Sequence, residues 1–251
     1  MTDQFAAYPS IEAAMNARYR GHDTRDWEVW RAKHSYGDAP EIEGNADRAW
    51  INRDKINYSG LGEKTALRHL IAANVDQPML DEIGKLTKLE RLELEWPMVA
   101  PDLSPLAKLT KLRHLSIDSP RKVESFSVLA HMPMLRTLLI SNAKHLNDLE
   151  WLRGADHLQV IGIEGAMDTK QTIASLDPLA GLKSLEAFFG TSLRLVDPDL
   201  TPLTACPSLK YLGVARFAKK PAFDALREAR PDLNCMWFDD ASWGKSGLRP
   251  A

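Results

Sequence analysis

The sequence has 251 residues, of which 44% are apolar and 26% are charged, and its formal net charge is −2. These proportions are typical of a folded protein, and the charge balance lacks the basic excess that binds nucleic acid. The sequence contains no run of about 18 apolar residues, so we expect no membrane-spanning segment and no membrane partner.

The cysteines, the histidines and the first residues indicate in which compartment the protein is found and whether it has a metal or catalytic site. The start of the chain lacks the apolar segment of a secretory signal, and the two cysteines stand 29 residues apart, at positions 206 and 235. We interpret both as reduced thiols of a cytoplasmic protein. The seven histidines show no His-x-x-x-His spacing, and no serine or cysteine has the surroundings of an activated nucleophile. We therefore expect no metal, no cofactor and no catalytic residue.

Residues 1–60 differ in pattern from the rest of the chain and are interpreted as an N-terminal cap. A helix is predicted from Ser10, as its N-cap, to about Arg20. Several aromatic residues follow, including Trp27, Trp30 and Trp50, in a strongly charged stretch. We interpret them as a cover for the open end of the core that follows. A partner-docking arm and a small catalytic domain are the alternatives.

From residue 61 to residue 238 the chain repeats one short pattern. Its apolar residues stand at steps of three, three and two, as in Leu86, Leu89, Leu92 and Leu94. The second position recurs at residues 67, 89, 112, 135, 158, 185, 209 and 233, which makes about eight copies. Such self-similarity predicts a solenoid.

The spacing of the apolar residues in the repeat predicts its secondary structure. The last two apolar residues of each copy are two apart, so they would share one face of a strand. Neighbouring copies would then form a parallel sheet with about 4.8 Å between strands and a continuous core. The return segments, such as residues 103–109 and 176–182, carry apolar residues at steps of three and an early proline. That pattern predicts short α or 3₁₀ turns.

In these residues the chain resembles the leucine-rich repeat family, most closely its internalin-like and SDS22-like short repeats. The resemblance implies an α/β solenoid with a curved parallel β-sheet on the concave side and short α/3₁₀ turns on the convex side. The family often has an asparagine three residues after the last strand leucine. Those positions here include Pro97, Pro120 and Ala143, and Asn142 stands one place early. The turns must therefore be closed in another way.

The C-terminal part predicts a helix and an end cap. Residues 221–230 begin with proline and place Phe223 and Leu226 on one face of a helix. We expect Met236 and Phe238 to point into the core from the last strand. Residues 239–251 are interpreted as a C-terminal cap in which Trp243 covers the end of the stack.

Alternate strand residues would point away from the core and form the concave surface. The resemblance implies that this surface recognises a protein, so we predict an adaptor or inhibitor and not an enzyme. Four carboxylates would steer a basic partner and the aromatic residues would anchor it. The predicted partner-binding residues are Glu93, Glu95, Asp118, Leu139, Glu164, Phe189, Tyr211 and Trp237.

Several alternatives stay open. Phe189 and Trp237 are either exposed anchors or covered by the protein's own tail or by a second copy, so self-association is possible. The chain is alternatively an injected or secreted effector, or an enzyme whose site lies within residues 1–60. The longest repeat interval contains extra residues within 165–175, which we interpret as a polar loop.

Overall fold

The computed structural model describes residues 27–244. The helix predicted over residues 10–20 and the last residues of the predicted C-terminal cap lie outside the described part of the chain.

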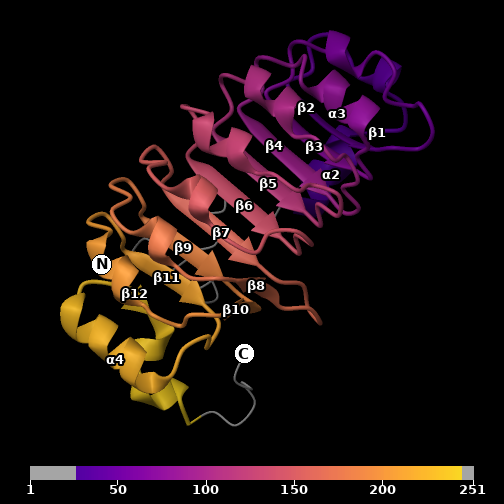
Figure 1. The fold of residues 1–251 in the computed structure, drawn as a ribbon. Helices are drawn as coiled ribbons and strands as arrows, with labels where there is room; N and C mark the ends of the chain where they lie inside the picture. The colour runs from indigo at the N-terminus through magenta and orange to yellow at the C-terminus, as the bar shows by residue number, and fades with distance from the viewer. Residues whose placement is uncertain (1–26, 245–251) are drawn as a thin grey trace.

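Parallel strands stacked side by side build the molecule (Figure 1). One parallel sheet has the order β1-β2-β3-β4-β5-β6-β7-β9-β11-β12, and β8 and β10 form a second, two-stranded parallel sheet. The strands are β1 (Ser35–Tyr36), β2 (Arg48–Asn52), β3 (His69–Ala73), β4 (Arg91–Glu95), β5 (His114–Asp118), β6 (Thr137–Ser141), β7 (Val160–Glu164), β8 (Gln171–Ile173), β9 (Ala187–Gly190), β10 (Leu193–Leu195), β11 (Tyr211–Val214) and β12 (Asn234–Cys235).

Short helical turns return the chain from one strand of the main sheet to the next. The α-helices are α2 (Trp27–His34), α3 (Gln77–Ile83) and α4 (Lys220–Ala229). The 3₁₀ turns are η1 (Ala39–Glu41), η2 (Leu61–Glu63), η3 (Ser104–Lys108), η4 (Ser127–His131), η5 (Glu150–Leu152), η6 (Asp177–Leu179), η7 (Thr201–Ala205), η8 (Met236–Phe238) and η9 (Asp240–Ser242). Proline stands in the first turn of η3, η6 and η7, where a missing amide donor costs nothing.

The register of the main sheet is the one that the repeat predicts. Leu115 of β5 pairs with Leu92 on one side and with Leu138 on the other, and Leu138 pairs in turn with Ile161. All four side chains are fully buried in the core. Because each copy contributes the same apolar positions, the core continues from strand to strand along the stack. The predicted solenoid is confirmed.

The main sheet extends into the residues assigned to the N-terminal cap. β2 pairs with β3 in full register, and β1 pairs with β2. Ala49 and Ile51 of β2 are completely buried, as are the equivalent residues of the later strands. The stack therefore begins before the first clear leucine repeat.

The turns that lack the family's asparagine are closed by residues placed one or two positions after the strands. Asn74, Ser119, Asn142 and Ser192 all have left-handed backbone, with φ between 51° and 58°. Short polar side chains tolerate this conformation because they hydrogen-bond locally. Asn142 Nδ2 donates to Ser119 Oγ at 2.7 Å, and Asn142 N donates to the carbonyl of Glu164 at 2.8 Å. Hydrogen bonds between neighbouring turns thus replace those that the family's asparagine would make.

The extra residues of the long repeat are partly structural, so their interpretation as a polar loop was incomplete. Gln171 and Ile173 of β8 are buried. The side-chain oxygen of Gln171 accepts a hydrogen bond from Ala143 N at 2.9 Å, and its Nε2 donates to Leu146 O at 2.5 Å. Gln171 therefore supplies, from a later segment, the amide that the repeat containing Ala143 lacks.

The predicted register of the last repeat was wrong by one residue. Cys235 pairs with Leu212, so the core position falls on Cys235 and not on Met236. Met236 is 48% exposed, whereas Trp237 is only 2% exposed. The predicted placement of Trp237 on the concave surface is corrected accordingly, because a repeat shortened by one residue turns its side chain inwards.

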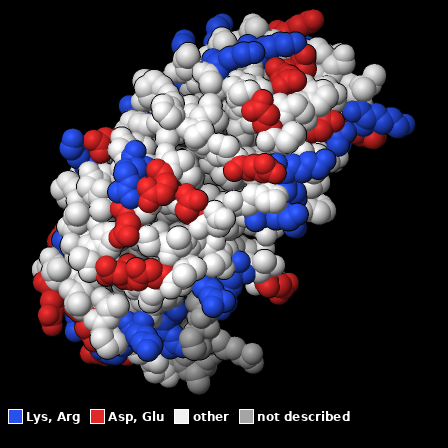
Figure 2. Space-filling model, viewed as in Figure 1, with Lys and Arg blue, Asp and Glu red and all other residues white. Residues whose placement is uncertain are grey.

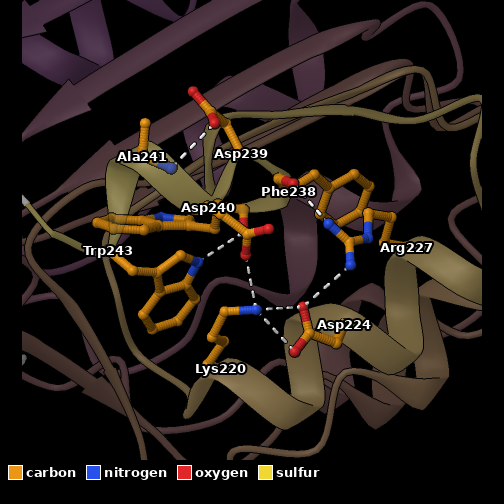
Figure 3. Close-up of polar contacts among 9 residues, drawn as sticks. Lys220, Asp224, Arg227, Phe238, Asp239, Asp240, Ala241 and Trp243 are labelled. Atoms are coloured by element: carbon orange, nitrogen blue, oxygen red, sulfur yellow. Dashed lines mark hydrogen bonds and ion pairs between the residues drawn. The ribbon is translucent and has the colours of Figure 1, made fainter.

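Trp237 is the centre of the C-terminal cap. Its Nε1 donates to the carbonyl of Val214 at 2.8 Å, and its ring lies 6.2 Å from Phe223 of α4 and 5.3 Å from Trp243. Trp243 Nε1 donates to the carbonyl of Trp237 at 2.9 Å, so Trp243 covers this end of the stack as predicted. Lys220 contacts both Asp224 and Asp240 at 2.9 Å and thereby links α4 to η9 (Figure 3).

Candidate functional site

A pocket lies over strands β4 to β7 of the main sheet. Its volume is about 230 Å³. Four carboxylates and two hydroxyls contribute to its wall, and the lining residues are Glu93, Leu94, Glu95, Ser116, Asp118, Leu139, Ile140, Ser141 and Glu164. Five of the predicted partner-binding residues therefore meet at one hollow, which we call the acidic pocket.

The sheet register explains why these side chains converge. Glu93 pairs with Ser116, Ser116 with Leu139, and Leu139 with Gly162, so this row crosses the concave surface from β4 to β7. Neighbouring strands are about 4.8 Å apart, which brings carboxylates of successive repeats within reach of one ligand. Gly162 leaves room for Leu139, because a Cβ at this position would lie 2.8 Å from Leu139 Cδ2 and the leucine side chain would have to shift.

Glu93 is the most buried of the four carboxylates, at 6% exposure. Its Oε1 accepts a hydrogen bond from Arg91 Nε at 2.8 Å and lies 3.2 Å from His69 Nε2. A buried carboxylate needs such partners, because removal from water is costly for an unpaired charge. Glu93 is therefore held in place at the floor of the acidic pocket by residues of its own and the preceding strand.

Neutral donors position the other carboxylates. Glu95 Oε2 accepts from Trp50 Nε1 at 3.0 Å, and Asp118 Oδ1 accepts from the hydroxyls of Ser119 and Ser141 at 2.9 and 3.1 Å. Within residues 27–244, neither Glu95 nor Asp118 forms an ion pair. Their hydrogen bonds fix the direction of the oxygens but leave the negative charge available to a ligand.

Glu164 completes the wall of the pocket on β7. Its Oε1 accepts hydrogen bonds from the backbone amide and the hydroxyl of Thr191, which stands directly after β9. The amide contact is 3.4 Å long. Glu164 is 8% exposed, so its side chain is largely buried in the wall.

A second group of side chains on the concave surface is apolar, and we call it the apolar cluster. It consists of Leu139, Val160, Ala187, Phe189 and Tyr211. The rings of Phe189 and Tyr211 are 5.5 Å apart. The cluster lies over β6, β7, β9 and β11, next to the acidic pocket, and Leu139 belongs to both.

Phe189 points away from the main core, as predicted, and its burial agrees with the covered alternative and not with the exposed anchor. Its side chain is 2% exposed, and that of Tyr211 is 8% exposed. The glycine on each side allows this arrangement. A Cβ at Gly213 would lie 3.0 Å from the ring of Phe189, and one at Gly162 would lie 3.6 Å from Phe189 Cβ. The two glycines therefore leave room for the phenylalanine ring between β7 and β11.

The concave surface also receives α2, which the sequence did not predict. The rings of Trp30 and His69 are 4.8 Å apart, and the guanidinium of Arg31 lies 4.2 Å from the centre of the Trp50 ring. His69 and Trp50 are outward residues of β3 and β2. The sequence analysis did not predict the polar partners of Glu93 and Glu95 either, although alternation along the strands places His69 and Arg91 on the same face as Glu93.

Surface charge is mixed elsewhere. Figure 2 shows acidic and basic side chains interspersed over the face in view. In the described part of the chain, no group of histidine, cysteine and acidic side chains is arranged to hold a metal ion. None of the helices in residues 27–244 has both the length and the apolar character needed to cross a membrane.

Comparison with solved structures identifies the architecture. A leucine-rich repeat protein from Leptospira interrogans superimposes with a TM-score of 0.54 over 80% of this chain at 16% sequence identity. The chain folds as a leucine-rich repeat solenoid. An internalin (inlF) from Listeria monocytogenes gives a TM-score of 0.48 over 74% of the chain at 19% identity.

The chain spans about half the length of these two solved structures. It covers 51% of the Leptospira protein and 56% of the Listeria internalin. No family model matches the sequence, and no curated protein is significantly similar to it. At these identities the likeness concerns the fold alone.

Proposed function

We propose that this leucine-rich repeat solenoid binds a basic segment of another protein at its acidic pocket, as an adaptor or inhibitor and not as an enzyme. The observation that carries the proposal is how the carboxylates of Glu95 and Asp118 are hydrogen-bonded. Both carboxylates line the pocket, both are oriented by neutral donors, and neither forms an ion pair within residues 27–244.

The pocket suits a lysine or arginine side chain. Its volume of about 230 Å³ accommodates one long side chain. Carboxylates placed on neighbouring strands accept charge-assisted hydrogen bonds from a guanidinium or an ammonium group, and these are stronger than neutral ones. The local negative charge would also accelerate encounter with a basic partner at low ionic strength.

The experiment that tests the proposal is capture of partners by the full chain, followed by measurement of the affinity of each purified partner. The double variant Glu95→Gln with Asp118→Asn removes two charges while keeping the size of both side chains. The matched control is Asp102→Asn with Glu150→Gln, which removes two charges from exposed residues at the return segments.

We expect the pocket variant to weaken binding about tenfold or more, which corresponds to roughly 1.4 kcal/mol, and to reduce its salt dependence. The control variant should bind as the parent does. Equal affinity of the two double variants would refute the acidic pocket as the binding site.

A further inference from the structure

Two large apolar side chains are exposed beside the two ends of the acidic pocket. Trp96 directly follows Glu95 at the end of β4 and is 62% exposed. Met167 follows Glu164 of β7 after two intervening residues and is 96% exposed. Glu95 and Glu164 line the pocket on the first and the last of its strands. The carboxylates are therefore flanked on both sides by side chains that gain free energy when another molecule removes them from water.

The fold makes little use of either side chain. Within residues 27–244 the indole nitrogen of Trp96 donates no hydrogen bond, whereas those of Trp50, Trp237 and Trp243 each donate one. Met167 lies in a loop that is closed by a hydrogen bond of 2.8 Å from Ala166 N to the carbonyl of Thr169. Tryptophan and methionine are enriched in protein interfaces, and tryptophan contributes strongly to affinity there. Both side chains are thus placed to contact a ligand of the pocket.

The distance between the two apolar side chains specifies the form of the ligand. β4 and β7 are three strand spacings apart in the main sheet, which amounts to about 14 Å. An extended peptide advances about 3.3 Å per residue and places alternate side chains on one side, so residues four apart are separated by about 13 Å on the same side. A helix would need about nine residues for this distance and would place further turns of side chains over the pocket. The spacing favours an extended segment.

The middle of such a segment lies over the centre of the pocket. β5 and β6 are the two strands between β4 and β7, and their last residues, Asp118 and Ser141, both line the pocket. Ser141 Oγ donates to Asp118 Oδ1 at 3.1 Å and so orients the carboxylate. A basic residue in the middle of the segment would therefore meet Asp118, while residues two positions away on either side would meet Trp96 and Met167.

We propose that the acidic pocket binds an extended segment of a partner protein in which a basic residue has an apolar residue two positions before it and another two positions after it. Asp118 and Glu95 bind the basic side chain, and Trp96 and Met167 each contact one of the apolar side chains. This inference rests on the proposed function, because it specifies the segment that the pocket recognises.

The test uses short fluorescent peptides and the full chain, with affinity measured by fluorescence anisotropy. The spaced peptide is Gly-Ser-Leu-Gly-Arg-Gly-Leu-Ser-Gly. The shifted peptide, Gly-Ser-Gly-Leu-Arg-Leu-Gly-Ser-Gly, has the same composition and charge but places each leucine next to the arginine. A third peptide is the spaced one with glutamine in place of arginine. We expect the spaced peptide to bind about tenfold or more tightly than the shifted one, because its leucines are removed from water by Trp96 and Met167.

A matched pair of double variants shows which side chains read the spacing. Trp96→Ala with Met167→Ala removes the two apolar side chains beside the pocket. Ile56→Ala with Met236→Ala removes two exposed apolar side chains that do not line it, and these are 72% and 48% exposed. We expect the first variant to bind the spaced and shifted peptides equally, and the control variant to keep the preference of the parent.

Equal affinities of the parent for the spaced and shifted peptides would overturn the inference, as would a preference that persists in Trp96→Ala with Met167→Ala. If these equal affinities still fall with the glutamine peptide and with Glu95→Gln and Asp118→Asn, the proposed function stands without this inference. If neither change affects the affinity, or if none of the peptides binds, the recognition of a basic segment by the pocket is contradicted together with the inference.

Discussion

Adjacent residues at the C-terminal end of the solenoid test its register. The sequence predicts that Met236 lies in the core and that Trp237 is on the outward face of the last strand, whereas the structure reverses the two, with exposures of 48% and 2%. The two registers therefore predict opposite effects of Trp237→Ala and Met236→Ala on stability. We expect the tryptophan substitution to be costly and the methionine substitution to be nearly neutral.

The magnitude follows from what Trp237 contacts. Its ring packs between Phe223 and Trp243, and its Nε1 donates to the carbonyl of Val214 at 2.8 Å. Truncation of a fully buried tryptophan lowers the free energy of unfolding by about 3–5 kcal/mol, through lost transfer energy and the cavity left behind. Met236→Ala should change it by less than about 0.5 kcal/mol, as for other surface positions.

Urea unfolding followed by circular dichroism of the backbone measures both variants without relying on tryptophan emission. The dependence of unfolding free energy on urea should be compared as well, because loss of an end cap can make the last repeat unfold separately from the rest. Similar losses in the two variants, or a larger loss for Met236→Ala, would refute the register of the last repeat.

Other positions give independent predictions. Leu138→Ala should lower the free energy of unfolding by about 2–5 kcal/mol in the same urea assay, because Leu138 is completely buried between neighbouring repeats; an unchanged midpoint would contradict the core assignment. Gln171→Leu should cost about 1–3 kcal/mol, since it leaves two backbone groups of an earlier turn without their partner; a stability equal to that of the parent would show that the turn does not need this amide. Burial, and then the charge of Arg136, lower the pKa of His157 in the folded state, so the unfolded state binds the proton more readily and stability falls as pH decreases through about 6.5. His157→Gln should lose less stability than the parent between pH 7 and pH 5, and identical losses in parallel urea titrations would exclude this contribution.

The repeat could be predicted from the sequence because its information is local. Apolar residues at fixed steps, such as Leu92 and Leu94, determine which side of each strand faces the core, and the common register of the copies aligns them. The register predicted for the last repeat was wrong because the interval from Leu212 to Cys235 is 23 residues, one shorter than the interval of 24 from Leu209 to Leu233. Two adjacent apolar residues then offered two plausible registers.

The acidic pocket was predictable to the same extent as the register. Once the strands are aligned, Glu93, Asp118 and Glu164 fall on the same part of the concave surface, over β4 to β7. Their partners were not predictable, because the hydrogen bonds from Trp50 and Thr191 depend on side-chain conformations of distant segments. The burial of the apolar cluster escaped prediction for a similar reason, since the exposure of an outward strand residue depends on what packs on it and not on its residue type.

The convergence of the carboxylates depends on strand register, and backbone nuclear magnetic resonance measures that register most directly. Cross-strand contacts between the backbone protons of residues 115, 138 and 161 should be strong, because Leu138 pairs with Leu115 on one side and Ile161 on the other. A pairing shifted by one residue would turn Leu139 into the core and separate the carboxylates, and it would contradict the proposed binding surface.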